Sequence, residues 1–270
     1  MKKQTTKYLE IYDIAISGLT KEGRDYAKKG GEIIIPEGIE IITKDAFNGT
    51  FLKHVKLPST LEIIGESAFR GTEIEEIVIP KMTEDIGDFA FQNSKLQKVT
   101  LEKGSKLKVL RRCAMDTGYL KELNLEEATS LMGLKSRALV FNKLKHLKIK
   151  TDEDLYIGLQ AVYSSDILDV DIESKGDVTI SVMGFNQNEK LKNVRIKGKK
   201  IYLEENSFAY CDIENLEIEG DEVTVLNGAF FSNRIKSPKI KNIYFCDLSA
   251  FSENPIENLD IPDEIKNKEA

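Results

Sequence analysis

A small residue followed by a bulky apolar residue recurs every 21 to 24 residues along this chain. The ten pairs are Ala46-Phe47, Ala68-Phe69, Ala90-Phe91, Ala114-Met115, Ala138-Leu139, Ala161-Val162, Gly184-Phe185, Ser207-Phe208, Ala229-Phe230 and Ala250-Phe251. A fixed period of this length is typical of a solenoid, because one repeat is too small to bury its own apolar face and must stack on its neighbours. We therefore expect one elongated domain, and we look for function on its surface.

A second pattern, apolar-x-x-apolar-x-apolar, lies between successive pairs. It begins at Leu52, Val55 and Leu57 and recurs as far as Ile256, Leu259 and Ile261, with proline after several copies. Its last two apolar positions alternate with other residues, which is typical of a short strand with one buried face. Proline ends such a strand because it has no N–H to donate. We expect these strands, with an opening strand at 33–35, to form one long parallel sheet on the concave face.

The other half of each repeat changes character along the chain. In the first repeats it reads apolar-x-x-apolar, as in Ile39 to Ile42 and Leu61 to Ile64, a spacing that favours short helical or 3₁₀ segments. Later it reads Leu155-Tyr156-Ile157 and Val178-Thr179-Ile180, which is β-branched and alternating. We expect helical turns outside the N-terminal half and a second, short-stranded sheet outside the C-terminal half. The small residue should permit close stacking of coils, and the bulky residue should fill the core.

The repeat resembles the BspA-like class of bacterial leucine-rich repeats over residues 30 to 262. The resemblance rests on the run from Leu61 to Phe69 followed by Ile74, Ile77, Ile79 and Pro80. The cysteine that members often carry three residues after the phenylalanine occurs here only as Cys211. The resemblance implies a right-handed α/β leucine-rich repeat superhelix. It also implies a surface or secreted bacterial protein that binds proteins or matrix without catalysis, which is an argument by analogy of fold.

The chain divides into three parts on these patterns. Residues 1–30 are expected to form an N-terminal cap, with a strand at 8–14 and a helix from Thr20 as N-cap to the stop at Gly30-Gly31. Residues 31–262 are the solenoid of about ten repeats. Residues 263–270 are a C-terminal tail or a truncated repeat, so the chain either ends in a cap or is a piece of a longer solenoid.

Composition narrows the class of protein. Apolar residues make up 41% and charged residues 31% of the chain, values that fit a folded, water-exposed domain. No window approaches 18 uncharged apolar residues, so no membrane insertion is expected. The net charge of -6, with Lys and Glu interspersed, argues against nucleic acid as partner. The basic start lacks an apolar segment and predicts no signal peptide. A surface or secreted location is expected if the chain is a fragment, and a cytoplasmic one otherwise.

Residues that flank the buried strand positions should point outward on the concave face. The candidate ligand-binding residues there are His54, Lys56, Glu76, Lys98, Glu122, His146, Lys148, Asp169, Asp171, Asn193, Arg195, Glu217 and Tyr244. This face is polar and of mixed charge. A carbohydrate platform or an interface hot spot is typically rich in exposed aromatic residues, and here only Tyr244 is aromatic.

Candidate catalytic and metal-binding groups are sparse. His54 and His146 are four strands apart, about 19 Å at the usual strand spacing, so they cannot share a metal or a proton. Each could act as a lone acid or base beside Glu76 or Glu122, but a plain solvent-facing role is the commoner one. The three cysteines fall at different phases of the repeat without C-x-x-C spacing, which favours inert thiols. The acidic runs at 152–154 and 166–171 lack the features of a calcium loop. We expect no cofactor and no metal.

The leading functional prediction is a non-enzymatic recognition module that binds a protein partner through the repeat surface, with a glycan as an alternative ligand. A second hypothesis is a passive structural spacer of a larger cell-surface protein, or a cytosolic protein-interaction scaffold. A third is a hydrolase that uses one histidine and one glutamate. The oligomeric state stays open, although an uncapped last repeat at Ile256, Leu259 and Ile261 would favour a homotypic contact.

Overall fold

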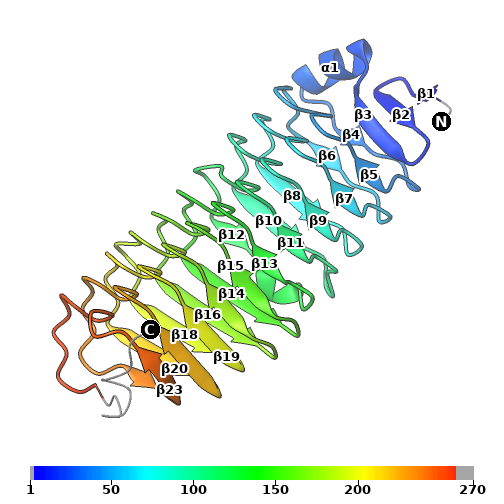
Figure 1. Cartoon of the computed structure of the whole chain (residues 1–270). Coiled ribbons are helices and arrows are strands. Elements are labelled where there is room, and N and C mark those ends of the chain that lie inside the picture. The colour runs from blue at the N-terminus through cyan, green and yellow to red at the C-terminus, as the bar shows by residue number, and fades with distance from the viewer. Residues whose placement is uncertain (1–2, 260–270) are drawn as a thin grey trace.

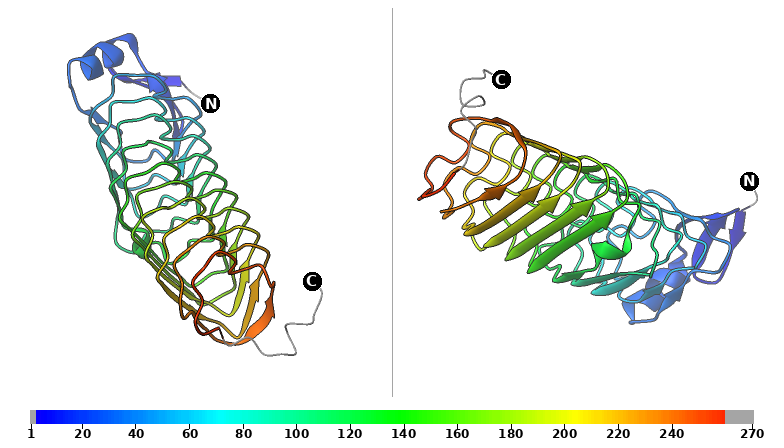
Figure 2. Two further views of the ribbon diagram at one scale, coloured as in Figure 1. Left: turned by 90° about the vertical axis from the view of Figure 1, so that its left-hand side faces the viewer. Right: turned by 90° about the horizontal axis from the view of Figure 1, so that it is seen from below.

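The chain winds into coils that stack along one axis, with the first and last coils at opposite ends of an elongated molecule (Figure 1). This is a computed structural model, and it describes residues 3–259. Each coil runs through one strand on a front side and one on a back side (Figure 2). The apolar side chains of both sides meet in the interior. The stacked solenoid predicted from the repeat is confirmed. Ile261 and residues 263–270 lie outside the described range.

A small antiparallel unit opens the chain. Strands β1 (Lys3–Thr5), β2 (Leu9–Tyr12) and β3 (Ala15–Leu19) pair in order, and helix α1 (Lys21–Lys28) follows. Thr20 is the N-cap as predicted, since its side chain accepts the N–H of Gly23 at 3.0 Å. Strand β3 pairs in parallel with the first back strand of the solenoid, so this unit is continuous with the stack.

The back sheet runs the whole length of the solenoid with thirteen strands, β1 to β3 included. Its other strands, all parallel, are β5 (Ile41–Ile42), β7 (Ile63–Ile64), β9 (Asp85–Ile86), β11 (Val109–Leu110), β13 (Gly133–Leu134), β15 (Leu155–Ile157), β17 (Val178–Ile180), β19 (Lys200–Leu203), β21 (Glu222–Val225) and β23 (Ile243–Cys246).

The expectation of helical segments outside the N-terminal half was wrong. Within residues 33–259 the 3₁₀ helix η1 (Leu125–Glu127) is the one helical element, and it follows a front strand. The apolar-x-x-apolar spacing instead comes from a bend followed by a two-residue strand, so that Leu61 and Ile64 are both buried. The N–H of Glu62 bonds to the carbonyl of Glu40 in the preceding coil at 2.8 Å. Because backbone groups are satisfied between coils, a helix within the coil has no advantage.

The front strands form three sheets rather than the one long sheet expected. A two-stranded sheet joins β4 (Ile33–Ile34) and β6 (Val55–Lys56), and a three-stranded sheet joins β8 (Glu76–Ile79), β10 (Lys98–Leu101) and β12 (Glu122–Leu123). A five-stranded sheet joins β14 (His146–Thr151), β16 (Asp169–Ser174), β18 (Asn193–Lys197), β20 (Asn215–Glu219) and β22 (Lys239–Ile240).

The breaks in the front lie between β6 and β8 and between β12 and β14. Pro58 and Pro80 closely follow β6 and β8, and without an N–H they end these strands. After β12 the side chain of Asn124 bonds both the N–H of Leu101 at 2.8 Å and its carbonyl at 3.1 Å. A side chain thus replaces the backbone ladder at the point where η1 begins.

The strand assignment of the last coils also differs from the prediction. Strand β22 at Lys239–Ile240 is the front strand, in register with Glu217 and Ile218. The segment Ile243–Cys246, which was expected on the front, is strand β23 of the back sheet. Its pairing with β21 changes register between Val223 and Thr224. Pro238 stands where the preceding repeat has Leu216, so the apolar pattern was read from Ile240 instead of from Ile235. Tyr244 is therefore not on the front face.

The small-bulky pairs line the interior at a turn between the two sides. In nine coils the residue before the small one has a left-handed backbone conformation with positive φ. These residues are Asp45, Ser67, Phe89, Cys113, Arg137, Gln160, Met183, Asn206 and Gly228. The bulky residue donates its N–H to the carbonyl of the small residue in the next coil, as from Phe69 to Ala90 at 2.8 Å. The phenyl rings stack in two runs, with 5.1 and 5.2 Å between the centroids of Phe47, Phe69 and Phe91.

Candidate interaction face

The outward side chains of the front strands alternate in charge from one strand to the next. Acidic and basic rows follow each other along the solenoid as Glu32; His54 and Lys56; Glu76; Lys98; Glu122; His146, Lys148 and Lys150; Asp169, Asp171 and Glu173; Arg195 and Lys197; Glu217 and Glu219; and Lys239. Neighbours in register on parallel strands are close enough to interact, so each row faces opposite charge on both sides.

Cross-strand ion pairs form along this face. Lys98 Nζ lies 2.8 Å from a carboxylate oxygen of Glu122, and Arg195 lies 2.9 Å from Asp171. The hydrogen bond to Glu122, followed by the Coulombic attraction, raises the pKa of the Lys98 ammonium. Pairs this exposed add little to the stability of the fold, because water screens the attraction. Because opposite charges alternate, the front face has little net electrostatic potential. Such a face suits a partner that is recognised through short-range contacts rather than a polyelectrolyte.

A hydrogen-bonded row crosses four strands of the C-terminal half. His146 Nδ1 lies 2.7 Å from Asp169, Asn193 donates to the other oxygen of Asp169, and Asn215 donates to Asn193 Oδ1 at 2.8 Å. The carboxylate beside His146 is therefore Asp169 and not Glu122, which is paired with Lys98. Because these polar groups already hydrogen-bond to one another, a partner would gain less free energy by bonding to them.

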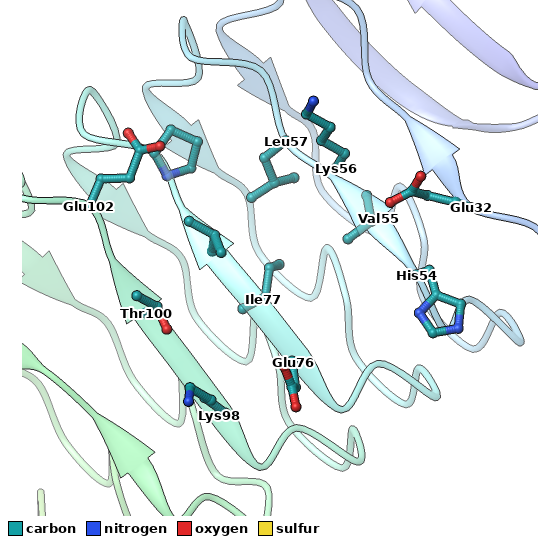
Figure 3. A pocket seen from close by; sticks show the side chains of 12 residues that line it. Glu32, His54, Val55, Lys56, Leu57, Glu76, Ile77, Lys98, Thr100 and Glu102 are labelled. Atoms are coloured by element: carbon teal, nitrogen blue, oxygen red, sulfur yellow. The ribbon is translucent and has the colours of Figure 1, made fainter.

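The N-terminal half of the front face is hollowed. An open hollow of about 450 Å³ lies over β6, β8 and β10 (Figure 3). Among the described residues, Glu32, His54, Lys56 and Glu76 of this hollow make no ion pair within 4.0 Å, whereas Lys98 pairs with Glu122. Val78 lies in the same hollow and is 53% exposed. We call this region the N-terminal hollow; it combines unpaired charges with an exposed apolar side chain.

Two further hollows lie on the same face. One of about 530 Å³ spans β10, β12 and β14 and includes Glu122, His146 and Lys148. The other, about 320 Å³, spans β16, β18 and β20, where Asp171 is paired with Arg195. All three hollows are open to solvent.

The structure groups most of the residues that the sequence singled out. The N-terminal hollow holds His54, Lys56, Glu76 and Lys98, whereas Tyr244 lies on the opposite side of the solenoid. Sequence reasoning missed Glu32, Val78, Thr100 and Glu102, which also line that hollow. Glu32, Val78 and Thr100 flank buried strand positions, so their outward direction followed from the sequence, but only the close approach of four coils shows which residues surround one space.

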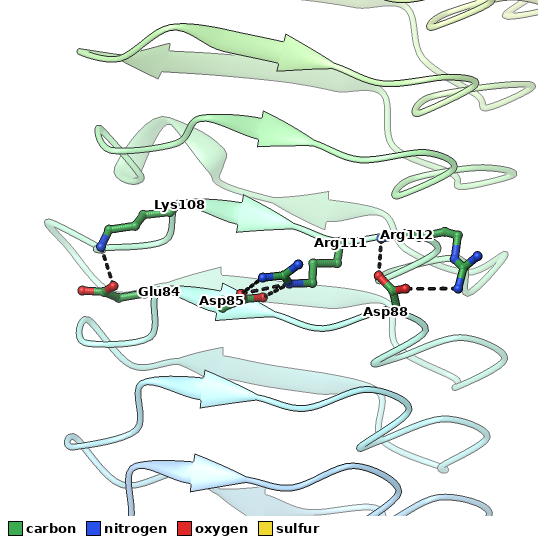
Figure 4. Close-up of polar contacts among 6 residues, drawn as sticks. All are labelled: Glu84, Asp85, Asp88, Lys108, Arg111 and Arg112. Carbon is green, nitrogen blue, oxygen red and sulfur yellow. Dashed lines mark hydrogen bonds and ion pairs between the residues drawn. The ribbon is translucent and has the colours of Figure 1, made fainter.

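The back of the N-terminal half is also charged. Arg111 holds Asp85 through both carboxylate oxygens at 2.6 to 2.9 Å, and Lys108 and Arg112 pair with Glu84 and Asp88 on the adjacent coil (Figure 4). The hydrogen bond to Asp85 raises the pKa of the Arg111 guanidinium. These pairs link neighbouring coils.

The thiols are unsuited to nucleophilic chemistry. All three cysteines are reduced and buried. Burial raises the pKa of Cys211 and of Cys246 to about 12, and it also raises the pKa of Cys113. At neutral pH a thiol with so high a pKa carries almost no thiolate, which is the reactive form.

Two kinds of feature are absent from the described part of the chain, a cluster of metal-binding side chains and a membrane-spanning helix. Within residues 3–259 no three His, Cys, Asp or Glu side chains come together in a way that could hold a metal ion. None of the helices in that range is long and apolar enough to cross a bilayer.

Comparison with known proteins places the chain in a family. The model of the BspA type leucine rich repeat region matches six copies over residues 26–143 and 155–269. A leucine-rich repeat protein from Bacteroides ovatus is 21% identical, with a TM-score of 0.37, over 78% of this chain and 74% of its own. The pneumococcal vaccine antigen PcpA is 18% identical, with a TM-score of 0.32, over 84% and 79%. No curated protein has a matching sequence. The chain belongs to the BspA type leucine rich repeat family.

Proposed function

We propose that this chain is a non-catalytic recognition module that binds a protein partner through the N-terminal hollow. The proposal rests on the difference between the two halves of the front face. In the hollow, His54, Lys56 and Glu76 are unpaired around the exposed Val78, whereas the C-terminal half bonds its polar groups to one another. Unpaired charges can pair with a partner without first losing an internal contact, and an apolar centre supplies burial.

The family supports an interaction role, since repeats of this kind form long surfaces rather than enclosed pockets. The chemistry also supports a role without catalysis. His146 has a carboxylate neighbour in Asp169, but the buried cysteines with raised pKa values supply no thiolate for it to activate. The hollow contains one histidine, His54, with no ion-pair partner to orient it.

The proposal is tested with two variants of equal net charge. The first exchanges the charges of the hollow, Lys56→Glu with Glu76→Lys. The control exchanges an ion pair on the back, Lys108→Glu with Glu84→Lys, which keeps that pair intact in reversed order. Wild-type protein is screened at micromolar concentration against an array of extracellular matrix and cell-surface proteins, and each hit is titrated by calorimetry.

We expect at least one protein to bind, with affinity reduced about tenfold or more by the exchange in the hollow and unchanged by the control. An array without reproducible hits would leave the passive spacer as the better account. Hits that bind both variants equally would place the interaction elsewhere on the molecule.

A further inference from the structure

A row of aromatic and threonine side chains runs along the C-terminal half of the back sheet. Cross-strand register aligns Tyr156 of β15 with Thr179, Thr179 with Tyr202 of β19, Tyr202 with Thr224, and Thr224 with Phe245 of β23. An aromatic residue thus occurs on every second strand from β15 to β23. We call this set of five residues the back row.

The back row faces outward. On each of β15, β17, β19 and β21 the residues on either side of the row position are buried, and alternate side chains of a strand point to opposite faces. Tyr156 is 38% and Tyr202 41% exposed, and the two threonines between and beyond them are half-buried. Because neighbouring strands are about 4.8 Å apart, the aromatic residues recur about every 10 Å along a flat surface.

Charged groups at both ends of these strands are engaged with one another, and the Lys135 ammonium lies over the Tyr156 ring. The carboxylate of Asp177 accepts the N–H of Lys200 at 3.1 Å, and the Lys200 ammonium pairs with Glu222 at 3.1 Å. At the other end of the strands, Glu204 accepts the hydroxyl of Ser181 at 2.8 Å. The row itself has no ionisable carboxylate or amine, in contrast to the Asp85–Arg111 pair further along the same sheet. It therefore complements an uncharged partner.

Two features of the row are already ordered before any ligand arrives. The parallel ladder from β15 to β21 holds the row positions in one plane, and Lys135 Nζ lies 5.0 Å from the centroid of the Tyr156 ring. An ordered aromatic side chain loses little conformational entropy on binding, which favours affinity from a small contact area.

We propose that the back row binds an uncharged, extended polysaccharide of β-linked pyranose rings that lies along the solenoid axis. In such a chain each ring advances by about one strand spacing, so every second ring meets an aromatic side chain. The apolar face of a sugar ring can stack on the aromatic ring, and the hydroxyls at its edge can bond to the threonine and tyrosine hydroxyls. The site is separate from the N-terminal hollow, and it stands whether or not that hollow binds a protein.

The test is depletion of the full chain from solution by microcrystalline cellulose and by chitin. The double variant Tyr156→Ala with Tyr202→Ala removes two aromatic residues of the row. The control, Tyr119→Ala with Tyr210→Ala, removes two tyrosines of similar exposure, 49% and 50%, outside the row. A soluble β-1,4-linked hexasaccharide serves as competitor with wild-type protein, so one arm requires no substitution. Sedimentation velocity reports self-association of every variant.

We expect saturable binding of wild-type protein to at least one of the two solids, displaced by the hexasaccharide. Loss of two stacking rings should weaken it about tenfold, and the control should bind like wild type. The proposal is overturned if wild-type protein binds neither solid, if the hexasaccharide does not compete, or if the control loses as much affinity as the row variant. It is equally overturned if the row variant changes self-association alone, which would identify a second copy as the occupant.

Discussion

Truncation of a stacked phenylalanine should destabilise the solenoid by several kcal/mol. Phe69 is fully buried and lies between Phe47 and Phe91, with centroid distances of 5.1 and 5.2 Å. Phe69→Ala removes both contacts and opens a cavity that rigid neighbouring coils cannot fill, for an expected loss of about 3–5 kcal/mol. Phe69→Leu keeps most of the volume and should lose about 1–1.5 kcal/mol.

The matched control is Phe51→Ala, since Phe51 is 57% exposed. A substitution at such a surface position should change the free energy of unfolding by less than about 0.5 kcal/mol. Urea unfolding followed by far-ultraviolet circular dichroism measures the midpoint and slope for each variant.

Native-state hydrogen exchange then tests whether the damage is local. In a solenoid each coil contacts only its neighbours, so protection should fall first in the coils around Phe69 and stay high near Phe208. The reasoning is refuted if Phe69→Ala costs no more than Phe51→Ala, or if protection falls evenly along the chain.

Three other substitutions or treatments have definite expected results. Asn188→Ala removes three buried hydrogen bonds, two donated to the carbonyls of Val162 and Phe185 and one accepted from Ser165 N–H, each at 2.7 Å. It should destabilise by about 2–3 kcal/mol in urea, and the exposed Asn227→Ala should have little effect; equal effects would contradict the role of burial. Ellman's reagent at pH 8 should leave Cys211 and Cys246 unmodified in the native protein and react with them in urea, because burial raises the pKa of each thiol to about 12; rapid native labelling would disprove this. The hydrogen bond from Lys190 lowers the pKa of Asp166, so its contribution is present above the unfolded pKa of about 3.9 and is lost as pH falls through the lower folded value. Asp166→Asn should therefore reduce stability by less than about 1 kcal/mol at pH 6 and have no effect at the lowest pH, and a constant difference across that range would refute the linkage.

The sequence was sufficient to predict those features that depend only on residues close together in the chain. Thr20 caps α1 as predicted, since a cap depends on residues three positions apart. The strand positions of β8 and β16 were readable because buried and exposed side chains alternate within each strand. The back strands at Ile41–Ile42 and Ile63–Ile64 were misread as helical turns, because two residues are too few to show alternation.

The candidate sites depended on contacts between coils. The outward position of Lys56 followed from the sequence, but the close approach of Glu76 and Glu102 around one hollow did not. The back row was missed because Tyr156 and Tyr202 are 46 positions apart and register is set only when coils stack. Tyr244 was placed on the wrong face, because Pro238 interrupts the apolar pattern of the last front strand and the pattern was read from Ile240.

The sequence by itself determined that this chain is a stack of repeats, where its coils turn, and which side chains fill the core. Those properties recur in every repeat, and each depends only on contacts with neighbouring repeats of similar sequence. The tertiary structure alone decided that the back sheet is continuous and the front is not, which charges are paired, and which exposed rings share one row. These depend on the register between coils, and register is the outcome of backbone hydrogen bonds summed along the stack rather than of any one repeat.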